Sequence, residues 1–274
     1  DFALAIDDSN AEALTLKAFC YQQSGELQKS CDYYLRLAEQ QENKTRAYLA
    51  LAKTYFEMQD YTSSIYYIEA LLDNKDALSK YELSELYGDI ALCHAALKHI
   101  GVGQASIRRS LELNENDPDT LIVAGRFFLM EAKACNDETA KAENQAKGEL
   151  YFRQALNLIM EDERLDYLFT IGAACFDTQN FKLAAQYYEQ INREFPDNAP
   201  ATYFFLAYCY FYLEEAISCM HYIAKMKHEL PDAYSNLGTS DSILSDTRFN
   251  ELMRNLKDSV NNGKVAVSYT HLTL

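Results

Sequence analysis

The chain has 274 residues, of which 49% are hydrophobic, and it contains four prolines, nine glycines and no tryptophan. This composition excludes the collagen-like and intrinsically disordered classes of protein. The formal net charge of −16 argues against a nucleic-acid-binding protein, because lysine and arginine must neutralise a phosphate backbone. The chain also lacks an apolar run long enough to form a transmembrane helix.

A two-helix pattern returns along most of the chain. Residues 2–7 resemble the last turns of a helix, so residues 1–10 are predicted to end a truncated repeat whose first helix lay upstream. The same pattern position then opens six units, at Ala11, Thr45, Ser84, Pro118, Leu165 and Pro200. Two short amphipathic helices cannot bury their apolar faces alone. We therefore expect stacked helix pairs, each with a helix A and a helix B, over residues 11–230.

Two of the spacings between units exceed the usual one of about 34 residues. The second and third units are 39 residues apart, and the polar stretch at 73–79 predicts a longer loop between them. The fourth and fifth units are 47 residues apart, which indicates an insertion at about 131–147. Part of that insertion is rich in Ala, Lys, Glu and Gln, and this composition favours extension of a helix.

Each helix A carries a small residue at one fixed position, where a close crossing with helix B leaves no room for a larger side chain. These residues are Ala18, Ala52, Ala91, Gly125, Gly172 and Ala207. A large residue lies one turn earlier, at Leu14, Tyr48, Tyr87, Leu121, Leu168 and Tyr203. A mid-helix glycine costs about 1 kcal/mol relative to alanine, so Gly125 and Gly172 predict an especially close approach.

The second unit resembles the tetratricopeptide repeat, through Tyr48, Ala52 and Tyr55 in helix A, Asp60-Tyr61 in the turn and the small residue Ser64 in helix B. The fifth unit matches through Leu168, Gly172, Phe181, Ala184, Tyr188 and Pro196. The resemblance implies an all-α, right-handed α-solenoid of about six helix-turn-helix repeats with a C-terminal capping helix. We expect a fragment of a bacterial-type protein of this family.

The repeat pattern weakens after residue 230. Residues 231–238 resemble the start of a seventh helix A, and residues 246–257 place Phe249, Leu252, Met253 and Leu256 at helical spacing. Residues 231–258 are therefore predicted to form a degenerate repeat and the capping helix. Residues 259–274 are expected to be a disordered tail, of which 267–274 resemble a translated cloning artefact.

In the tetratricopeptide family the helices A line a concave face. Carried over, this places a partner-binding groove at Phe19, Arg46, Leu49, Lys53, Phe56, Leu92, Ile122, Arg126, Leu129, Phe169, Phe176, Phe204, Tyr208 and Phe211. The alternative is that these aromatic residues only pack between neighbouring helices A. The run 203–212 is apolar on nearly all sides, so either the insertion or a partner is expected to cover it.

One known binding mode of the family is not expected. Repeats that hold the C-terminal carboxylate of heat-shock chaperones use lysine, asparagine and arginine on consecutive helices A. The corresponding positions here carry Thr15, Phe19, Ala50, Glu85 and Asp89. The clamp residues are therefore absent, and we do not expect a chaperone cofactor of that kind.

The spacing of the cysteines and the lack of catalytic motifs argue against an enzymatic, cofactor or metal site. The seven cysteines are Cys20, Cys31, Cys93, Cys135, Cys175, Cys209 and Cys219; none forms a C-x-x-C pair, and most are predicted to be small core residues. This usage favours a reducing compartment, hence a cytoplasmic location, with the periplasm left open. The chain has no Gly-rich phosphate loop, G-x-S-x-G or H-E-x-x-H motif, so we expect no enzyme, cofactor or metal site.

The leading hypothesis is a protein–protein interaction scaffold or adaptor that holds a peptide or helix of a partner protein in the groove. Two alternatives stay open. The array could be the sensory or oligomerisation part of a larger regulator with a kinase or DNA-binding domain, or it could be an exported envelope-assembly protein.

Overall fold

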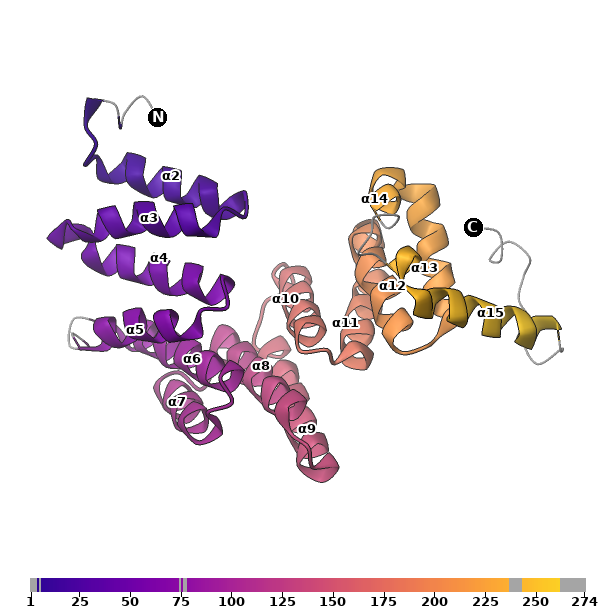
Figure 1. Ribbon diagram of the computed structural model, residues 1–274. Helices are drawn as coiled ribbons and strands as arrows, with labels where there is room; N and C mark the ends of the chain where they lie inside the picture. The colour runs from indigo at the N-terminus through magenta and orange to yellow at the C-terminus, as the bar shows by residue number, and fades with distance from the viewer. Residues whose placement is uncertain (1–3, 5, 74, 76–77, 237–242, 262–274) are drawn as a thin grey trace. The chain divides into compact units, whose positions relative to one another are not determined.

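The computed structural model describes residues 4, 6–73, 75, 78–236 and 243–261. Every element in those ranges is helical (Figure 1). The chain divides into two compact units, residues 1–155 (unit 1) and 156–274 (unit 2), and each is described by itself. No helix in the described ranges has both the length and the apolar character needed to cross a membrane.

Unit 1 consists of helices paired in chain order. They are α2 (Ala11–Gln23), α3 (Leu27–Ala38), the 3₁₀ helix η1 (Gln41–Asn43), α4 (Lys44–Glu57), α5 (Tyr61–Leu72), α6 (Lys80–Ala96), α7 (Ile100–Leu113), α8 (Pro118–Ala134) and α9 (Glu138–Leu156). The helices A are α2, α4, α6 and α8. Helices α2, α4 and α6 each pack against the helix B that follows, and α8 contacts α9 at Gly148. Figure 1 shows the antiparallel pairs stacked one after another from α2 to α7.

Unit 2 repeats this arrangement and then departs from it. Its elements are α10 (Arg164–Asp177), α11 (Phe181–Glu194), η3 (Pro196–Thr202), α12 (Tyr203–Tyr212), α13 (Ala216–Glu229), α14 (Pro231–Asn236), η4 (Ile243–Ser245) and α15 (Thr247–Asn261). Here α10 and α12 are the helices A. The predicted seventh helix A corresponds to the short α14, and α15 continues to Asn261, beyond the predicted end of the capping helix at residue 258.

The same backbone turn joins helix A to helix B in five of the described pairs. Gly25, Gln59, Lys98, Gln179 and Glu214 all have a positive φ, between 60° and 76°. In each turn the next residue donates its N–H to a carbonyl five residues earlier, as Asn180 does to Cys175 over 2.8 Å. A left-handed residue at this point satisfies the last carbonyls of the helix and reverses the chain. The shared turn is a structural sign of repetition in both units.

The small residues on helix A lie at the crossing with helix B, as predicted. Ala18, Ala91 and Ala207 are fully buried. A Cβ atom at Gly172 would lie 2.8 Å from Cε1 of Tyr188 in α11, which is closer than real Cβ contacts come. A Cβ atom at Gly125 would collide with the Phe152 ring of α9. Close approach of the two helices therefore explains both mid-helix glycines.

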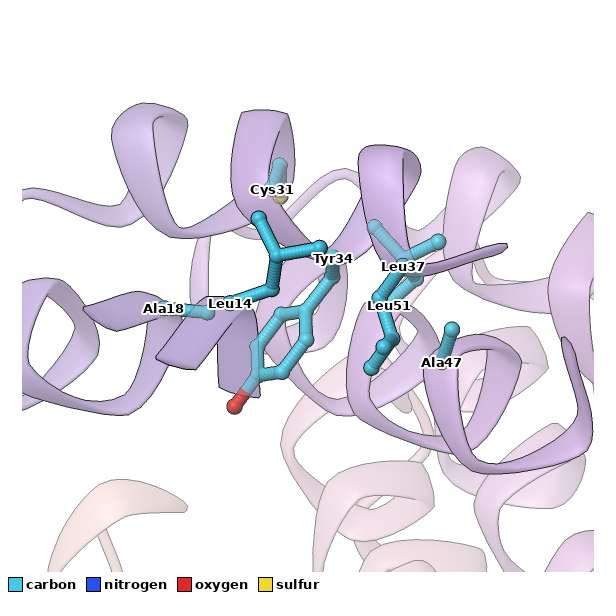
Figure 2. Close-up of a cluster of buried hydrophobic side chains, with 7 residues drawn as sticks. All are labelled: Leu14, Ala18, Cys31, Tyr34, Leu37, Ala47 and Leu51. Carbon is cyan, nitrogen blue, oxygen red and sulfur yellow. The ribbon is translucent and has the colours of Figure 1, made fainter. Parts of the chain in front are cut away.

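The core continues from one helix pair into the next helix A. Figure 2 shows a buried cluster in unit 1 whose residues come from α2, α3 and α4. Leu14 comes from α2, Tyr34 and Leu37 come from α3, and Leu51 comes from α4. Because α4 covers the apolar side of the α2–α3 pair, no pair has to bury its own faces alone.

The predicted insertion at 131–147 lies in the last helix pair of unit 1. It comprises the end of α8, a short break after Ala134 and the first half of α9. A Cβ atom at Gly148 would lie 2.9 Å from the carbonyl oxygen of Gly125, so α9 packs directly against the backbone of α8. The inserted residues therefore lengthen a helix pair.

The prediction that most cysteines are small core residues is confirmed, since five of the seven are buried. Cys31, Cys93, Cys175, Cys209 and Cys219 are buried, and Cys135 is half-buried. Cys20 is exposed, although it shares its pattern position with Cys93 and Cys209. Cys93 contacts Ser64 of α5, the preceding helix B, whereas Cys20 lies in the first helix A that the structure describes.

Several predictions fall outside the described residues in whole or in part. These are the end of a truncated repeat at 1–10, the loop at 73–79, the last part of the degenerate repeat at 237–242 and the tail from residue 262, which includes 267–274.

Candidate functional site

Helices α4, α6 and α8 bring charged and aromatic side chains of three successive units together on one face. Lys53 and Phe56 come from α4, Asp89 comes from α6 and Arg126 comes from α8. The Arg126 guanidinium lies 5.6 Å from the centroid of the Phe56 ring, a cation–π distance. A side chain of the fourth unit thus contacts one of the second unit across α6.

Asp89 is the most perturbed carboxyl group on this face. The pKa of Asp89 is raised to about 6. Burial is the largest cause and the Glu85 carboxylate adds to it, while the charges of Lys53 and Arg126 act in the opposite direction. The loss of water around the carboxylate therefore outweighs the attraction of two cations. Such a balance indicates an enclosed site with charges of both signs.

The other predicted groove residues of unit 1 fall into two groups. Phe19, Arg46 and Lys53 are exposed, and Leu49 and Phe56 are half-buried. Leu92, Ile122 and Leu129 are buried in the protein, so they cannot reach a ligand on this face. We call the accessible set, together with Asp89 and Arg126, the helix A face of unit 1.

The three buried residues correct the sequence prediction, and two of them show why it failed. Leu92 belongs to a cluster with Ile107 of α7 and Phe127 of α8. Leu129 faces the lengthened α9, because a Cβ atom at Gly148 would lie 3.0 Å from its Cδ2 atom. Both side chains therefore pack against a neighbouring helix. Ile122 is 6% exposed.

In unit 2 the predicted groove residues form an aromatic row. The Phe176 ring of α10 lies 5.5 Å from that of Phe205 and 6.4 Å from that of Tyr208 in α12. Phe204 is partly exposed, and its ring centroid lies 4.6 Å from that of Tyr208. The ring centroids of Phe169 and Tyr188 are 6.3 Å apart. Phe176 therefore packs between the neighbouring helices A α10 and α12, as the alternative interpretation states.

Phe211 and Tyr208 are covered by the chain itself. The Phe249 ring of α15 lies 6.4 Å from that of Phe211, and the Arg248 guanidinium lies 5.2 Å from the Phe211 centroid. The Tyr208 hydroxyl accepts a hydrogen bond from the backbone of Ile243, and burial raises the pKa of Tyr208. This contact differs from the expectation that the insertion or a partner covers α12, because the repeat pattern gives no indication of it.

The described side chains do not suggest a metal-dependent site. Within those ranges, no three His, Cys, Asp or Glu residues are grouped closely enough to hold a metal ion. The helix A face of unit 1 instead offers three cations, a half-buried carboxylate and two aromatic rings, which suit recognition of a polar chain by hydrogen bonds and packing.

The comparisons with known proteins agree with the repeat pattern. Residues 45–77, which begin in α4 and include α5, match the family model of the tetratricopeptide repeat. No curated protein sequence matches the chain. The matched unit is the one whose Tyr48, Ala52 and Tyr55 carry the resemblance. The chain is therefore a helical-repeat protein that carries a tetratricopeptide repeat at residues 45–77.

Proposed function

We propose that the helix A face of unit 1 binds an extended segment or a helix of a partner protein, so that the chain acts as an interaction scaffold. The tetratricopeptide repeat is in general a protein–protein interaction domain, and residues 45–77 supply two of the residues on this face, Lys53 and Phe56. A partner protein is thus the class of ligand that the repeat itself favours.

The observation that carries the proposal is the position of Asp89 between Lys53 and Arg126. The three charges come from three successive helices A, and burial raises the pKa of Asp89 to about 6 in spite of both cations. A structural ion pair on a solvated surface would show the opposite shift, because cations lower a carboxyl pKa. A carboxyl group shielded from water beside two cations therefore supports a recognition role beyond simple surface pairing.

Charges of both signs suit the backbone of an extended peptide. Each peptide group carries one N–H donor and one carbonyl acceptor. The Asp89 carboxylate can accept from an N–H group, while the Lys53 ammonium and the Arg126 guanidinium can donate to a carbonyl. This recognition needs no particular partner sequence, which fits a scaffold.

Apolar side chains beside the charges would supply the affinity. Leu49 and Phe56 are half-buried on α4, and Phe19 on α2 is 50% exposed. Aromatic and aliphatic side chains that stay accessible next to a polar cluster are typical anchors at interfaces. Leu49 and Phe56 lie two turns apart, about 10 Å along α4, so we expect a bound segment to place one apolar side chain against each.

The proposal is tested by selecting binding peptides from a random library on the full-length protein, and then measuring their affinities for two charge reversals. Lys53→Glu lies on the helix A face, and Arg108→Glu lies on an exposed position of α7, a helix B. Each substitution changes the net charge by the same amount. Peptides that bind the helix A face should lose at least about tenfold in affinity with Lys53→Glu, equivalent to about 1.4 kcal/mol.

The Arg108→Glu variant serves as the matched control and should bind like the wild-type protein. Equal affinities for both variants, with helical content preserved by circular dichroism, would remove the helix A face of unit 1 as the binding site. Loss of affinity with Arg108→Glu alone would place the site on the helices B.

A further inference from the structure

The segment formed by η4 and the start of α15, residues 243–249, lies against the helix A face of unit 2. The Tyr208 hydroxyl accepts a hydrogen bond from the backbone of Ile243. The Phe249 ring lies 6.4 Å from that of Phe211, and the Arg248 guanidinium lies 5.2 Å and 5.5 Å from the rings of Phe211 and Tyr212. Figure 1 shows α15 next to α12 and α13 within this unit.

The covered residues occupy the register positions that stay accessible on α4 of unit 1. Counted from the same pattern position, Tyr208 and Phe211 of α12 correspond to Lys53 and Phe56 of α4. Lys53 is exposed and Phe56 is half-buried, whereas Phe211 is only 6% exposed. The segment of residues 243–249 therefore lies where the proposed function places a partner in unit 1.

The segment is attached through two apolar side chains. Ile243 and Phe249 are buried, while Thr247, Arg248 and Asn250 between and beside them are exposed. A local turn sets their spacing: the Asp246 N–H donates to the Ile243 carbonyl over 3.1 Å, and the Phe249 N–H donates to the Asp246 carbonyl over 3.0 Å. Two anchors on a pre-formed turn are the arrangement of a short linear binding motif.

We propose that the helix A face of α12 is a peptide-binding surface that the chain's own residues 243–249 occupy, so that a partner segment must displace them to bind there. The occupant defines the chemistry of the partner. It carries an aliphatic anchor, an aromatic anchor six residues later and an arginine next to the aromatic residue, whose guanidinium packs over the Phe211 and Tyr212 rings.

This inference adds regulation to the proposed function, on the other unit. An intramolecular segment competes at a high effective concentration, so only partners with a stronger motif or a second contact would open this surface. The test below uses only the chain's own sequence, and its failure therefore leaves the helix A face of unit 1 untouched.

The experiment uses the full chain and a fluorescein-labelled synthetic peptide of residues 243–256 as the probe. In the opened variant, Ile243→Asp with Phe249→Glu removes both anchors. In the matched control, Thr247→Asp with Asn250→Glu adds the same charge at exposed positions of the same segment. Fluorescence anisotropy should show at least tenfold tighter peptide binding to the opened variant than to the wild type or the control. A peptide that itself carries Ile243→Asp and Phe249→Glu should not bind.

Hydrogen exchange of α12 and α13 separates a displaceable segment from an integral cap. A displaceable segment leaves both helices protected in the opened variant and in the milder Phe249→Ala variant, with intermediate peptide affinity for the latter. Loss of protection throughout α12 and α13 in both variants would show that the segment only completes the fold, and would overturn the proposal. Preserved protection with no gain in peptide affinity would overturn it equally.

Discussion

Arg126 of α8 lies with its guanidinium 5.6 Å from the Phe56 ring of α4, so side chains two repeat units apart meet across α6. Asp89 of α6, the helix A between them, is half-buried and close enough to Lys53 and Arg126 for both charges to act on its carboxyl group. Side chains of three successive helices A thus lie close together on one face.

The pH dependence of stability should report on Asp89. Its folded pKa of about 6 exceeds the ordinary value of 3.8, so ionisation costs folding free energy. The cost is fully present above pH 6 and is relieved as the pH falls through 6 towards 4. Asp89→Asn should therefore be more favourable at about pH 7.5 than at about pH 5, by on the order of 1 kcal/mol, after allowance for partial exposure. Urea unfolding at both pH values checks this. A variant–wild-type difference that is constant, or larger at pH 5, would contradict the balance of charges described for the site.

The crossing of α10 and α11 should not tolerate a methyl group at Gly172. Because its Cβ atom would lie 2.8 Å from the Tyr188 ring, Gly172→Ala should lower the free energy of unfolding by about 1–3 kcal/mol. Gly101 of α7 is the matched control, since nothing lies within 4 Å of its Cβ position. There the substitution should stabilise by about 0.5–1 kcal/mol through helix propensity. Thermal unfolding of the two variants should shift in opposite directions, and equal shifts would contradict the close crossing.

The turn between helix A and helix B prefers glycine on conformational grounds, although only the first of the five turns has it. Gly25 has a φ of 76°, so Gly25→Ala should cost about 1 kcal/mol in the free energy of unfolding. Gln179 has a φ of 62°, and Gln179→Gly should be neutral or stabilise by up to about 1 kcal/mol. Denaturant unfolding measures both. Stabilisation by Gly25→Ala would be inconsistent with the left-handed turn.

The buried cluster of Figure 2 should contribute much of the stability of the first helix pairs. Leu51 is fully buried between α4 and the α2–α3 pair, so Leu51→Ala should cost about 2–5 kcal/mol. Leu16 on α2 is 64% exposed, and Leu16→Ala should change the free energy of unfolding by less than about 0.5 kcal/mol. If both variants unfold at the same denaturant concentration, α4 does not cover the first pair as described.

The sequence predicts the helix pairs well because the signals are local. Gly172 and Tyr188 could be predicted to meet, since helical periodicity alone places a small residue opposite a large one at the crossing of α10 and α11. The turns follow from the same register, even where Gln59 or Lys98 replaces glycine.

The surface of the helices A was harder to predict. A helix A contacts its own helix B, the preceding helix B and the neighbouring helices A, and an apolar residue such as Leu92 or Leu129 fits each of these environments equally well. The insertion lengthens α9, which packs against Leu129, whereas Phe56 at the same register stays partly accessible. The contact of Ile243 with Tyr208 could not be predicted, because the repeat pattern that aligns the other helices is lost after residue 230.

Binding of partner segments across the helices A of unit 1 can be measured by hydrogen–deuterium exchange of the full chain, with and without a peptide selected for binding. We expect added protection in α4, α6 and α8, at the helix turns that carry Lys53, Asp89 and Arg126, with little change in α5 and α7. Protection confined to α5 and α7 would contradict it.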